Sequence, residues 1–322
     1  MTIRRLSLLV AAAACQAPGP SLVSPSVPPT SPAPPRAIPD ASADAWADAL
    51  PDAPTDAAIP TAAAPPAGTE HCGPASRVPA KPRPLTPKPS RCRGLVARLA
   101  DGRVLAVGDG CAELFDNGRW RAAQKPPRSP DEATLTALAE GTALLAGGRN
   151  GDAVADASVF DAKRDSWRAV APLKARRFAH AAVRLRDGRV LVSGGCEYVE
   201  ACCAEGMCLD SYELYDPRAD RWELHSMPQR SARAGHALVE LSDGRVLALG
   251  GILGDSPALP PSQVWDGTHW CAAPPLLAYR SLTAATPDPD GFAAVVSGPP
   301  EPPGPAIELY RYEKECQPAC PR

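Results

Sequence analysis

The most constraining feature of this chain is a short phrase, built around an Asp-Gly step, that occurs five times. The first copy reads Asp101-Gly-Arg-Val-Leu-Ala-Val-Gly108. The copies begin, at intervals of 39, 47, 56 and 47 residues, at Asp101, Glu140, Asp187, Asp243 and Asp290. A period of this size indicates an array of small units, none of which buries a hydrophobic face alone. We therefore predict that the units stack on one another.

Other residues recur in register with this step. An Arg stands ten residues before it in four copies, an aromatic residue follows the glycines, and a Trp comes five to seven residues later in four copies. In chain order these landmarks are Arg91, Phe115 and Trp120; Phe160 and Trp167; Arg177, Tyr215 and Trp222; Arg233, Trp265 and Trp270; and Arg280 and Tyr310. Each copy thus holds four strand-sized runs. Four antiparallel strands, repeated radially, make a β-propeller.

The residue types suit that architecture. Gly supplies the positive φ that a tight hairpin between the first two strands requires. The paired glycines end the second strand, where the lack of a Cβ lets a neighbouring backbone approach. The aromatic residue and the Trp supply the apolar area that seals one sheet against the next.

From about Arg91 to Cys320, the order Arg-x-x-His, Asp-Gly-Arg-Val-Leu-x-x-Gly-Gly, Tyr-Asp-Pro and Trp resembles the kelch repeat. The resemblance implies an all-β, kelch-type β-propeller of about five four-stranded blades. Kelch propellers usually have six or seven blades, and the alternative is a degenerate sixth blade within His71–Ser90. Prolines at the density found there oppose a central strand.

Residues 1–15 have the features of an export signal. Arg4 and Arg5 precede an apolar run, Leu6–Ala14, that is too short to span a bilayer. The run ends at Cys15 in a sequence that resembles a bacterial lipobox. That resemblance implies a lipid anchor and, with Gln16 next, outer-membrane sorting, so that the protein faces the periplasm or the cell surface. The alternative is an ordinary cleaved signal peptide with an incidental cysteine.

Residues 16–90 contain half of the 40 prolines, in a background of Ala, Ser, Thr and Asp. That composition buries too little apolar surface to offset the ordering of its backbone, so we expect a disordered Pro/Ala-rich tether. Residues 91–322 are the predicted propeller domain. The net charge of −2 disfavours nucleic acid as a partner.

Ten cysteines remain besides Cys15, an even number that suits an exported, oxidised protein. We expect up to five disulfides and leave their connectivity open. Because propellers close by joining their two ends, one hypothesis links Cys72 or Cys92 to Cys316 or Cys320; local pairs are the alternative. The candidates are Cys72, Cys92, Cys111, Cys196, Cys202, Cys203, Cys208, Cys271, Cys316 and Cys320.

The third copy carries an insertion, Cys196–Asp210, with four cysteines and several acidic residues. The spacing does not match a paired Cys-x2-Cys zinc site, so we expect a disulfide-bonded loop with no metal and no cofactor; a metal site is the alternative. Long loops on a rigid scaffold are where binding commonly resides. The candidate contact residues are Glu197, Tyr198, Glu200 and Glu205.

The recurring arginines allow two interpretations. In kelch-like propellers their position starts the innermost strand, near the central channel. A positive ring suited to a carboxylate or sulfate would then consist of Arg91, Arg177, Arg233 and Arg280. In the second interpretation each Arg serves the repeat and has a partner within it. His180 and His236, three residues after two of these arginines, follow the same logic.

These observations favour a non-catalytic binding or scaffold module at the cell envelope, monomeric and joined to the membrane only through its lipid. It would contact a protein or a glycan through the blade loops. The alternative is an envelope carbohydrate-active enzyme of kelch type, either a galactose-oxidase-like oxidase or a sugar isomerase. No Tyr-His grouping of the kind those oxidases require stands apart from the repeat, and the Gly-x-Ser-x-Gly and phosphate-loop motifs are missing.

Overall fold

The computed structural model describes residues 72–75, 92, 94–108, 110–128, 131–197, 208–228, 231–252, 261–277, 284–287, 293–297 and 307–312. Its regular elements are all β-strands. Within these ranges no helix has the length and apolar character needed to cross a membrane. The predicted export signal with Cys15, and the tether apart from residues 72–75, lie outside the described residues.

Five four-stranded antiparallel sheets, here called blades one to five, form the fold. Blade one consists of β2 (Gly94–Arg98), β3 (Val104–Gly108), β4 (Cys111–Asp116) and β5 (Arg119–Ala122). Blade two consists of β6 (Thr134–Ala137), β7 (Thr142–Ala146), β10 (Ala157–Asp161) and β11 (Ser166–Val170). Blade three consists of β12 (Ala181–Arg184), β13 (Val190–Ser193), β14 (Ser211–Asp216) and β15 (Arg221–Ser226). Blade four consists of β16 (Ala237–Glu240), β17 (Val246–Leu249), β18 (Ser262–Trp265) and β19 (Trp270–Ala273).

Blade five takes one strand from the start of the chain. Its strands are, in spatial order, β1 (Cys72–Ala75), β22 (Ile307–Tyr312), β21 (Ala293–Ser297) and β20 (Ala284–Pro287). β1 pairs antiparallel with β22, Cys72 opposite Tyr312. This strand lies before the predicted start of the propeller at Arg91, and it supplies the fourth strand that the Trp-lacking fifth copy does not provide. Its Pro74 is tolerated because β1 is an edge strand.

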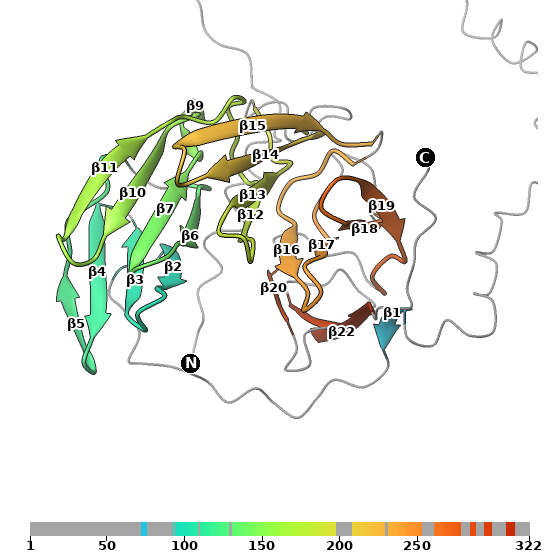
Figure 1. Ribbon diagram of the computed structural model, residues 1–322, viewed down its shortest axis with the longest axis horizontal. Coiled ribbons are helices and arrows are strands. Elements are labelled where there is room, and N and C mark those ends of the chain that lie inside the picture. Colours follow the sequence, from blue (N-terminus) through green and yellow to red (C-terminus); the bar gives the residue numbers. More distant parts are fainter. Residues whose placement is uncertain are drawn as a thin grey trace, which may run out of the picture. The chain divides into compact units, whose positions relative to one another are not determined.

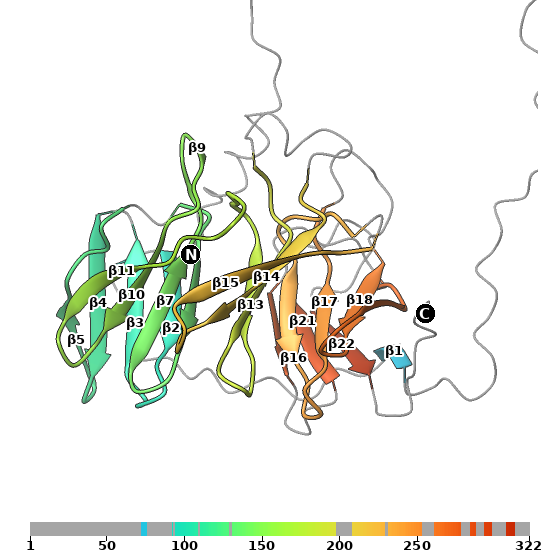
Figure 2. The ribbon, with the colours of Figure 1, turned by 45° about the horizontal axis from the view of Figure 1, so that its top comes forward.

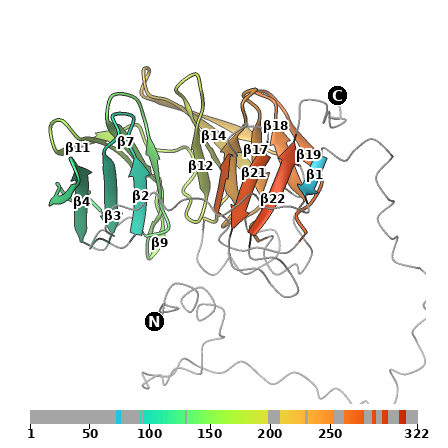
Figure 3. The ribbon, with the colours of Figure 1, turned by 90° about the horizontal axis from the view of Figure 1, so that it is seen from below.

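The blades follow one another in an arc whose concave side carries the inner strands β2, β6, β12, β16 and β20 (Figure 1). Neighbouring inner strands contact one another in that order. A short hairpin of β8 (Arg149–Asn150) and β9 (Asp152–Ala153) projects beyond the sheets of the arc (Figure 2), at the face opposite the Asp-Gly turns (Figure 3). The predicted all-β propeller of four-stranded blades is confirmed, and the described residues form five such blades.

The Asp-Gly turns have the conformation that the sequence predicts. Gly188 has a φ of 93°. Beside it, Asp187 accepts hydrogen bonds from the backbone N–H of Arg189 at 2.9 Å and from its Nε at 2.8 Å. The same Asp–Arg arrangement recurs at Asp101–Arg103 and at Asp243–Arg245.

The paired glycines are needed because two chains approach them from different sides. A Cβ on Gly147 would lie 2.6 Å from the carbonyl oxygen of Arg177 and 2.7 Å from Cε1 of His180. A Cβ on Gly148 would lie 2.8 Å from the Cβ of Ala133. The first glycine therefore admits the following blade and the second admits its own inner strand, as the sequence predicts.

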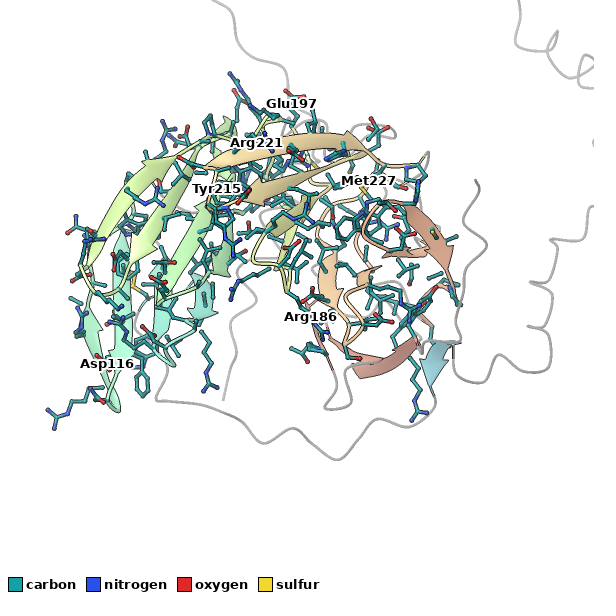
Figure 4. The ribbon with its side chains drawn as sticks, viewed as in Figure 1. Asp116, Arg186, Glu197, Tyr215, Arg221 and Met227 are labelled. Carbon is teal, nitrogen blue, oxygen red and sulfur yellow. A yellow bond between two sulfur atoms is a disulfide. The ribbon has the colours of Figure 1, made fainter. Side chains whose placement is uncertain are left out.

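The aromatic landmarks of blades two to five seal each of these blades against the preceding one. Tyr215 and Trp222 lie opposite each other on β14 and β15, with ring centroids 4.8 Å apart. Both are buried against Leu144 and Val159 of blade two, and Figure 4 shows Tyr215 in this position. Equivalent contacts join Phe160 to Leu105 and Leu114, Trp265 and Trp270 to Leu191 and Leu214, and Tyr310 to Leu247 and Val264. The predicted sealing role is confirmed.

Blade five keeps this contact without a Trp. In the third blade, Trp222 Nε1 donates a hydrogen bond to the carbonyl oxygen of Ala171 in the preceding blade at 2.8 Å. In the fifth blade, the hydroxyl of Tyr310 donates to the carbonyl oxygen of Pro274 at 2.6 Å. The degenerate copy thus attaches to its neighbour through a different side chain.

Candidate functional site

The recurring Arg of the third blade is buried inside that blade. Arg177 has no exposed surface, and its guanidinium donates hydrogen bonds to Glu213 Oε1 at 2.8 Å and to the carbonyl oxygen of Gly194 at 2.7 Å. Glu213 also accepts the backbone N–H groups of Lys174 and Ala175. Both charges are therefore compensated within the protein, as buried charges must be.

Arg233 occupies the same place in the fourth blade. It is also fully buried, and it donates to Gln263 Oε1 at 3.0 Å and to the carbonyl oxygen of Pro261 at 2.7 Å. Here Gln263 stands where Glu213 stands in the third blade. Burial lowers the pKa of Arg233 to about 10, which still leaves the guanidinium charged at neutral pH.

The predicted positive ring is wrong for Arg177 and Arg233, because both guanidinium groups are buried and hydrogen-bonded within their own blades. The structure shows the second interpretation at these two positions. Arg91 and Arg280 lie outside the described residues.

The partner of this Arg has a sequence signal that the repeat comparison missed. An acid or amide stands two residues before the aromatic landmark in four copies, as Glu113, Glu213, Gln263 and Glu308. The second copy has Pro130 in place of the Arg and Ser158 in place of the acid. The Arg and the acid or amide occur together in four copies and are both missing from the second. This joint occurrence would have predicted that the two side chains form a pair.

The two histidines link neighbouring blades. His180 Nε2 lies 2.9 Å from Thr134 Oγ1 of blade two, and His236 Nε2 lies 2.8 Å from Ser193 Oγ of blade three. Burial lowers the pKa of His180 to about 3 and holds that of His236 well below its usual value. Both rings are therefore neutral at physiological pH and serve the fold.

The insertion of the third blade is described only at its two ends. Glu197, labelled in Figure 4, is half-buried, whereas Tyr198, Glu200, Glu205, Cys202 and Cys203 lie outside the described residues. Cys196 is buried and disulfide-bonded, and its Sγ is 3.7 Å from the Sγ of Cys208. Among the described side chains no three of His, Cys, Asp or Glu gather as a metal site requires.

One predicted disulfide is corrected. Cys92 pairs with Cys111, whose Cα is 5.8 Å away, so the hypothesis that joins Cys92 to Cys316 or Cys320 is wrong. Gly94 at the start of β2 pairs with Gly108 of β3, and Gly108 pairs with Cys111 of β4, so the two cysteines meet at the same end of blade one. Cys271 is also disulfide-bonded; the side chain of Cys72, and Cys316 and Cys320, lie outside the described residues.

The described surface is hollowed between blades two and three, on the face of the Asp-Gly turns. This hollow, here called the cleft, has a volume of about 910 Å³. Its walls are the hairpin turns of both blades, and the apolar residues Leu138 and Val159 are part of its lining. The turn between β12 and β13, which bounds it on one side, is held to blade four by Arg186, whose backbone N–H donates to Glu240 Oε1 at 2.8 Å (Figure 4).

Charged side chains dominate the cleft. Its six arginines are Arg164, Arg168, Arg184, Arg186, Arg189 and Arg218, and its four acids are Glu140, Asp161, Asp187 and Asp216. Arg164 pairs with Asp161 at 2.9 Å, and Arg189 pairs with Asp187 at 2.8 Å. The sequence reasoning missed this cleft, because five of its six arginines stand outside the landmarks of the repeat and only their gathering in space marks them.

Comparisons with known proteins agree with the fold. No family model matches the chain. The chain is similar to Kelch-like protein 23 of Pongo abelii, with 28% identity over 109 residues, or 34% of this chain and 18% of that protein. It is similar to Kelch-like protein 23 of Homo sapiens, with 35% identity over 65 residues, or 20% of this chain and 11% of that protein.

A third relative is an F-box/kelch-repeat protein of Arabidopsis thaliana, 25% identical over 104 residues, or 32% of this chain and 25% of that protein. The matched segments thus span a quarter or less of these relatives. The solved structure of YjhT superimposes with a TM-score of 0.54 at 16% identity, covering 63% of this chain and 71% of that one. This likeness shows the fold alone.

Proposed function

We propose that this chain, which is a kelch-repeat β-propeller, is a binding module that holds a partner protein at the cell envelope and catalyses no reaction. One observation carries the proposal. The repeated arginines and histidines of blades three and four, which have the chemistry an active site needs, are buried and hydrogen-bonded inside the propeller. What faces solvent is a set of turns and loops with a charged cleft between two of the blades.

The envelope location rests on the sequence. An export signal that ends at Cys15 and the Pro-rich segment between it and β1 would place the propeller on a tether above a membrane. Intact mass measurement of the envelope-purified protein tests this. We expect a mass that begins at Cys15 and includes a diacyl or triacyl group; a mass that begins elsewhere without lipid would remove the anchor from the proposal.

Binding is tested with the full chain immobilised and exposed to detergent-solubilised envelope from its own source. The matched variant lacks residues 201–207, which removes Cys202 and Cys203 but keeps Cys196 and Cys208, whose Sγ atoms lie 3.7 Å apart and can pair. We expect one component to be retained saturably by the natural chain and its apparent Kd to rise at least tenfold in the loop variant. That component would be a protein; a retained glycan would change the partner class.

The enzyme alternative has its own outcome. If the purified chain retains nothing saturably but oxidises or isomerises a sugar, and one Tyr substitution abolishes that turnover, the chain is an enzyme and the binding proposal fails.

A further inference from the structure

We propose that the cleft between blades two and three is a carboxylate-binding site that takes an acidic peptide segment of the partner protein. The inference rests on the proposed binding function and names the chemistry that its surface recognises.

The cleft is built from rigid parts. Its walls are the β6–β7 and β12–β13 turns of the inner strands and the β10–β11 and β14–β15 turns of the outer strands. The β12–β13 turn is fixed by the Asp187–Arg189 hydrogen bonds, and the β14–β15 turn by Asp216, which accepts the backbone N–H groups of Arg218 and Ala219. A ligand would therefore meet preformed walls, as ligand sites commonly provide.

Three of the six arginines in the cleft have no close ion pair, although Arg184 lies in the field of Glu240 and Arg218 in that of Asp216. Within the described residues, Arg168, Arg184 and Arg218 form no ion pair and donate no side-chain hydrogen bond, although their neighbours Arg164 and Arg189 are both paired. Arg184 is half-buried, and its Nε is shielded from solvent with no hydrogen-bond acceptor in reach. Because this Nε is closed to solvent, a ligand carboxylate would pair with the exposed part of the guanidinium, where charge is less screened than in open water.

The acids of the cleft do not fill this role, because most are already engaged. Asp161 binds Arg164 and accepts two backbone N–H groups, and Asp187 binds Arg189. With six arginines against four acids, and with Glu240 of blade four beside Arg186, the lining keeps a surplus of one positive charge. This surplus and the three guanidinium groups without a close ion pair favour an anion as the ligand.

The mixed charge selects the kind of anion. A polyanion of phosphate or sulfate groups would meet four carboxylates as well as the arginines, whereas the single carboxylates of a peptide, each on its own flexible side chain, can each reach one guanidinium. An Arg binds a carboxylate through two parallel N–H···O bonds, which the planar fork makes specific. Leu138 and Val159 in the lining offer apolar contact for the aliphatic stems of Glu side chains. An acidic peptide segment fits these features best.

The test is a titration of the full chain with a fluorescein-labelled hexaglutamate peptide and, as the uncharged control, hexaglutamine. The cleft variants are Arg184→Gln and the double variant Arg168→Gln/Arg218→Gln. The matched control is Arg98→Gln/Arg119→Gln in blade one, which removes the same charge from exposed arginines outside the cleft; Arg98 pairs with Val104 as Arg184 pairs with Val190. We expect at least tenfold weaker hexaglutamate binding in each cleft variant and less than a twofold change in the control.

Two results would overturn the proposal. One is hexaglutamate that binds no better than hexaglutamine; the other is an equal loss of affinity in the blade-one control. A sulfated oligosaccharide or inorganic phosphate that displaces hexaglutamate at a lower concentration than unlabelled hexaglutamate would replace the acidic peptide as the ligand. If the double Gln variant does not fold, Arg168→Lys/Arg218→Lys keeps the charge but removes bidentate pairing, and a loss of at least threefold is expected.

The two proposals fail in different ways. If the chain binds hexaglutamate through the cleft but retains no envelope protein, the cleft assignment stands and the proposed function does not. If it retains a partner saturably while the cleft variants bind hexaglutamate as the natural chain does, only the cleft assignment is lost.

Discussion

The guanidinium of Arg177 and the carboxylate of Glu213 lie 2.8 Å apart, and neither side chain has any exposed surface. The pair spans the interior of one blade, from the segment that enters the inner strand to the third strand β14. Other polar atoms of the pair meet backbone groups, among them the carbonyl of Gly194 and the N–H of Lys174. This is why a residue type suited to binding anions is repeated in a place that no anion from solvent reaches.

Removing one member of this pair is predicted to destabilise the fold. Arg177→Met leaves the Glu213 carboxylate buried with only backbone donors, and we expect the free energy of unfolding to fall by about 3–5 kcal/mol. Glu213→Gln reproduces the pair found in blade four, where Arg233 meets Gln263, so its cost should be about 1 kcal/mol. Urea unfolding measures both. Equal stability of Arg177→Met and the natural chain would contradict the structural role.

The paired glycines give a prediction that separates conformational strain from crowding. Gly147 and Gly110 have nearly the same φ, 61° and 63°, but only at Gly147 would a Cβ collide, with the Arg177 carbonyl and the His180 ring. We expect Gly110→Ala to cost about 1 kcal/mol and Gly147→Ala clearly more, about 3 kcal/mol. Thermal or urea unfolding measures the loss of stability in both variants. Equal losses would show that the close approach of blade three to Gly147 does not contribute to the cost.

The buried histidines predict loss of stability in acid. Burial lowers the pKa of His180 to about 3, whereas an unfolded chain titrates near 6.5. Between these values the unfolded chain binds one more proton, so stability is full above pH 6.5 and falls as the pH decreases, by up to about 1.4 kcal/mol per pH unit. His236 acts in the same direction.

The matched experiment compares the natural chain with His180→Gln at pH 7 and pH 5. At pH 7 the variant is the less stable protein because the bond to Thr134 changes. At pH 5 the natural chain has lost the stability that the neutral His180 contributes. The difference in unfolding free energy between the natural chain and the variant should therefore narrow by about 2 kcal/mol. A gap that stays constant would mean that His180 is not buried as a neutral ring.

The disulfide of blade one predicts a specific peptide pair. Cys92 and Cys111 are 19 residues apart, and closing a loop of that length stabilises a fold by about 3 kcal/mol in the chain-entropy description. Cys92→Ser/Cys111→Ser should lower the free energy of unfolding by about that amount. A non-reducing peptide map checks the bond itself; a link from Cys92 to Cys316 or Cys320 would refute it.

The repeat predicted the parts of the fold that depend on local rules. The Asp-Gly turns, the glycine pairs and the aromatic seals each follow from what one residue type does at a fixed place, so Gly188, Gly147 and Tyr215 behave as their positions indicate. The sequence analysis did not predict the strand Cys72–Ala75, because this strand belongs to no copy of the repeat and pairs with a strand more than 200 residues away. Nothing local marks such a pairing.

The cleft lies beyond sequence reasoning for a related reason. Arg168, Arg184 and Arg218 come from two blades, and the repeat does not single them out. Blade one has Arg121 and Arg98 at the places of Arg168 and Arg184, whereas blade four has Cys271 and Glu240 there. Their meaning depends on which neighbouring acids are already paired, and only the assembled turns decide that. The repeat pattern therefore identified the arginines that stabilise the blades, and it did not identify the arginines that line the cleft.

The most direct measurement compares a repeated Arg with a cleft Arg in the same two assays, urea unfolding and hexaglutamate titration of the full chain. Our assignment predicts that Arg177→Met loses stability while its folded fraction keeps the natural affinity. It predicts that Arg184→Gln stays within about 0.5 kcal/mol of the natural stability and binds at least tenfold more weakly. The assignment would be contradicted if Arg184→Gln bound hexaglutamate normally, or if Arg177→Met folded normally and failed to bind.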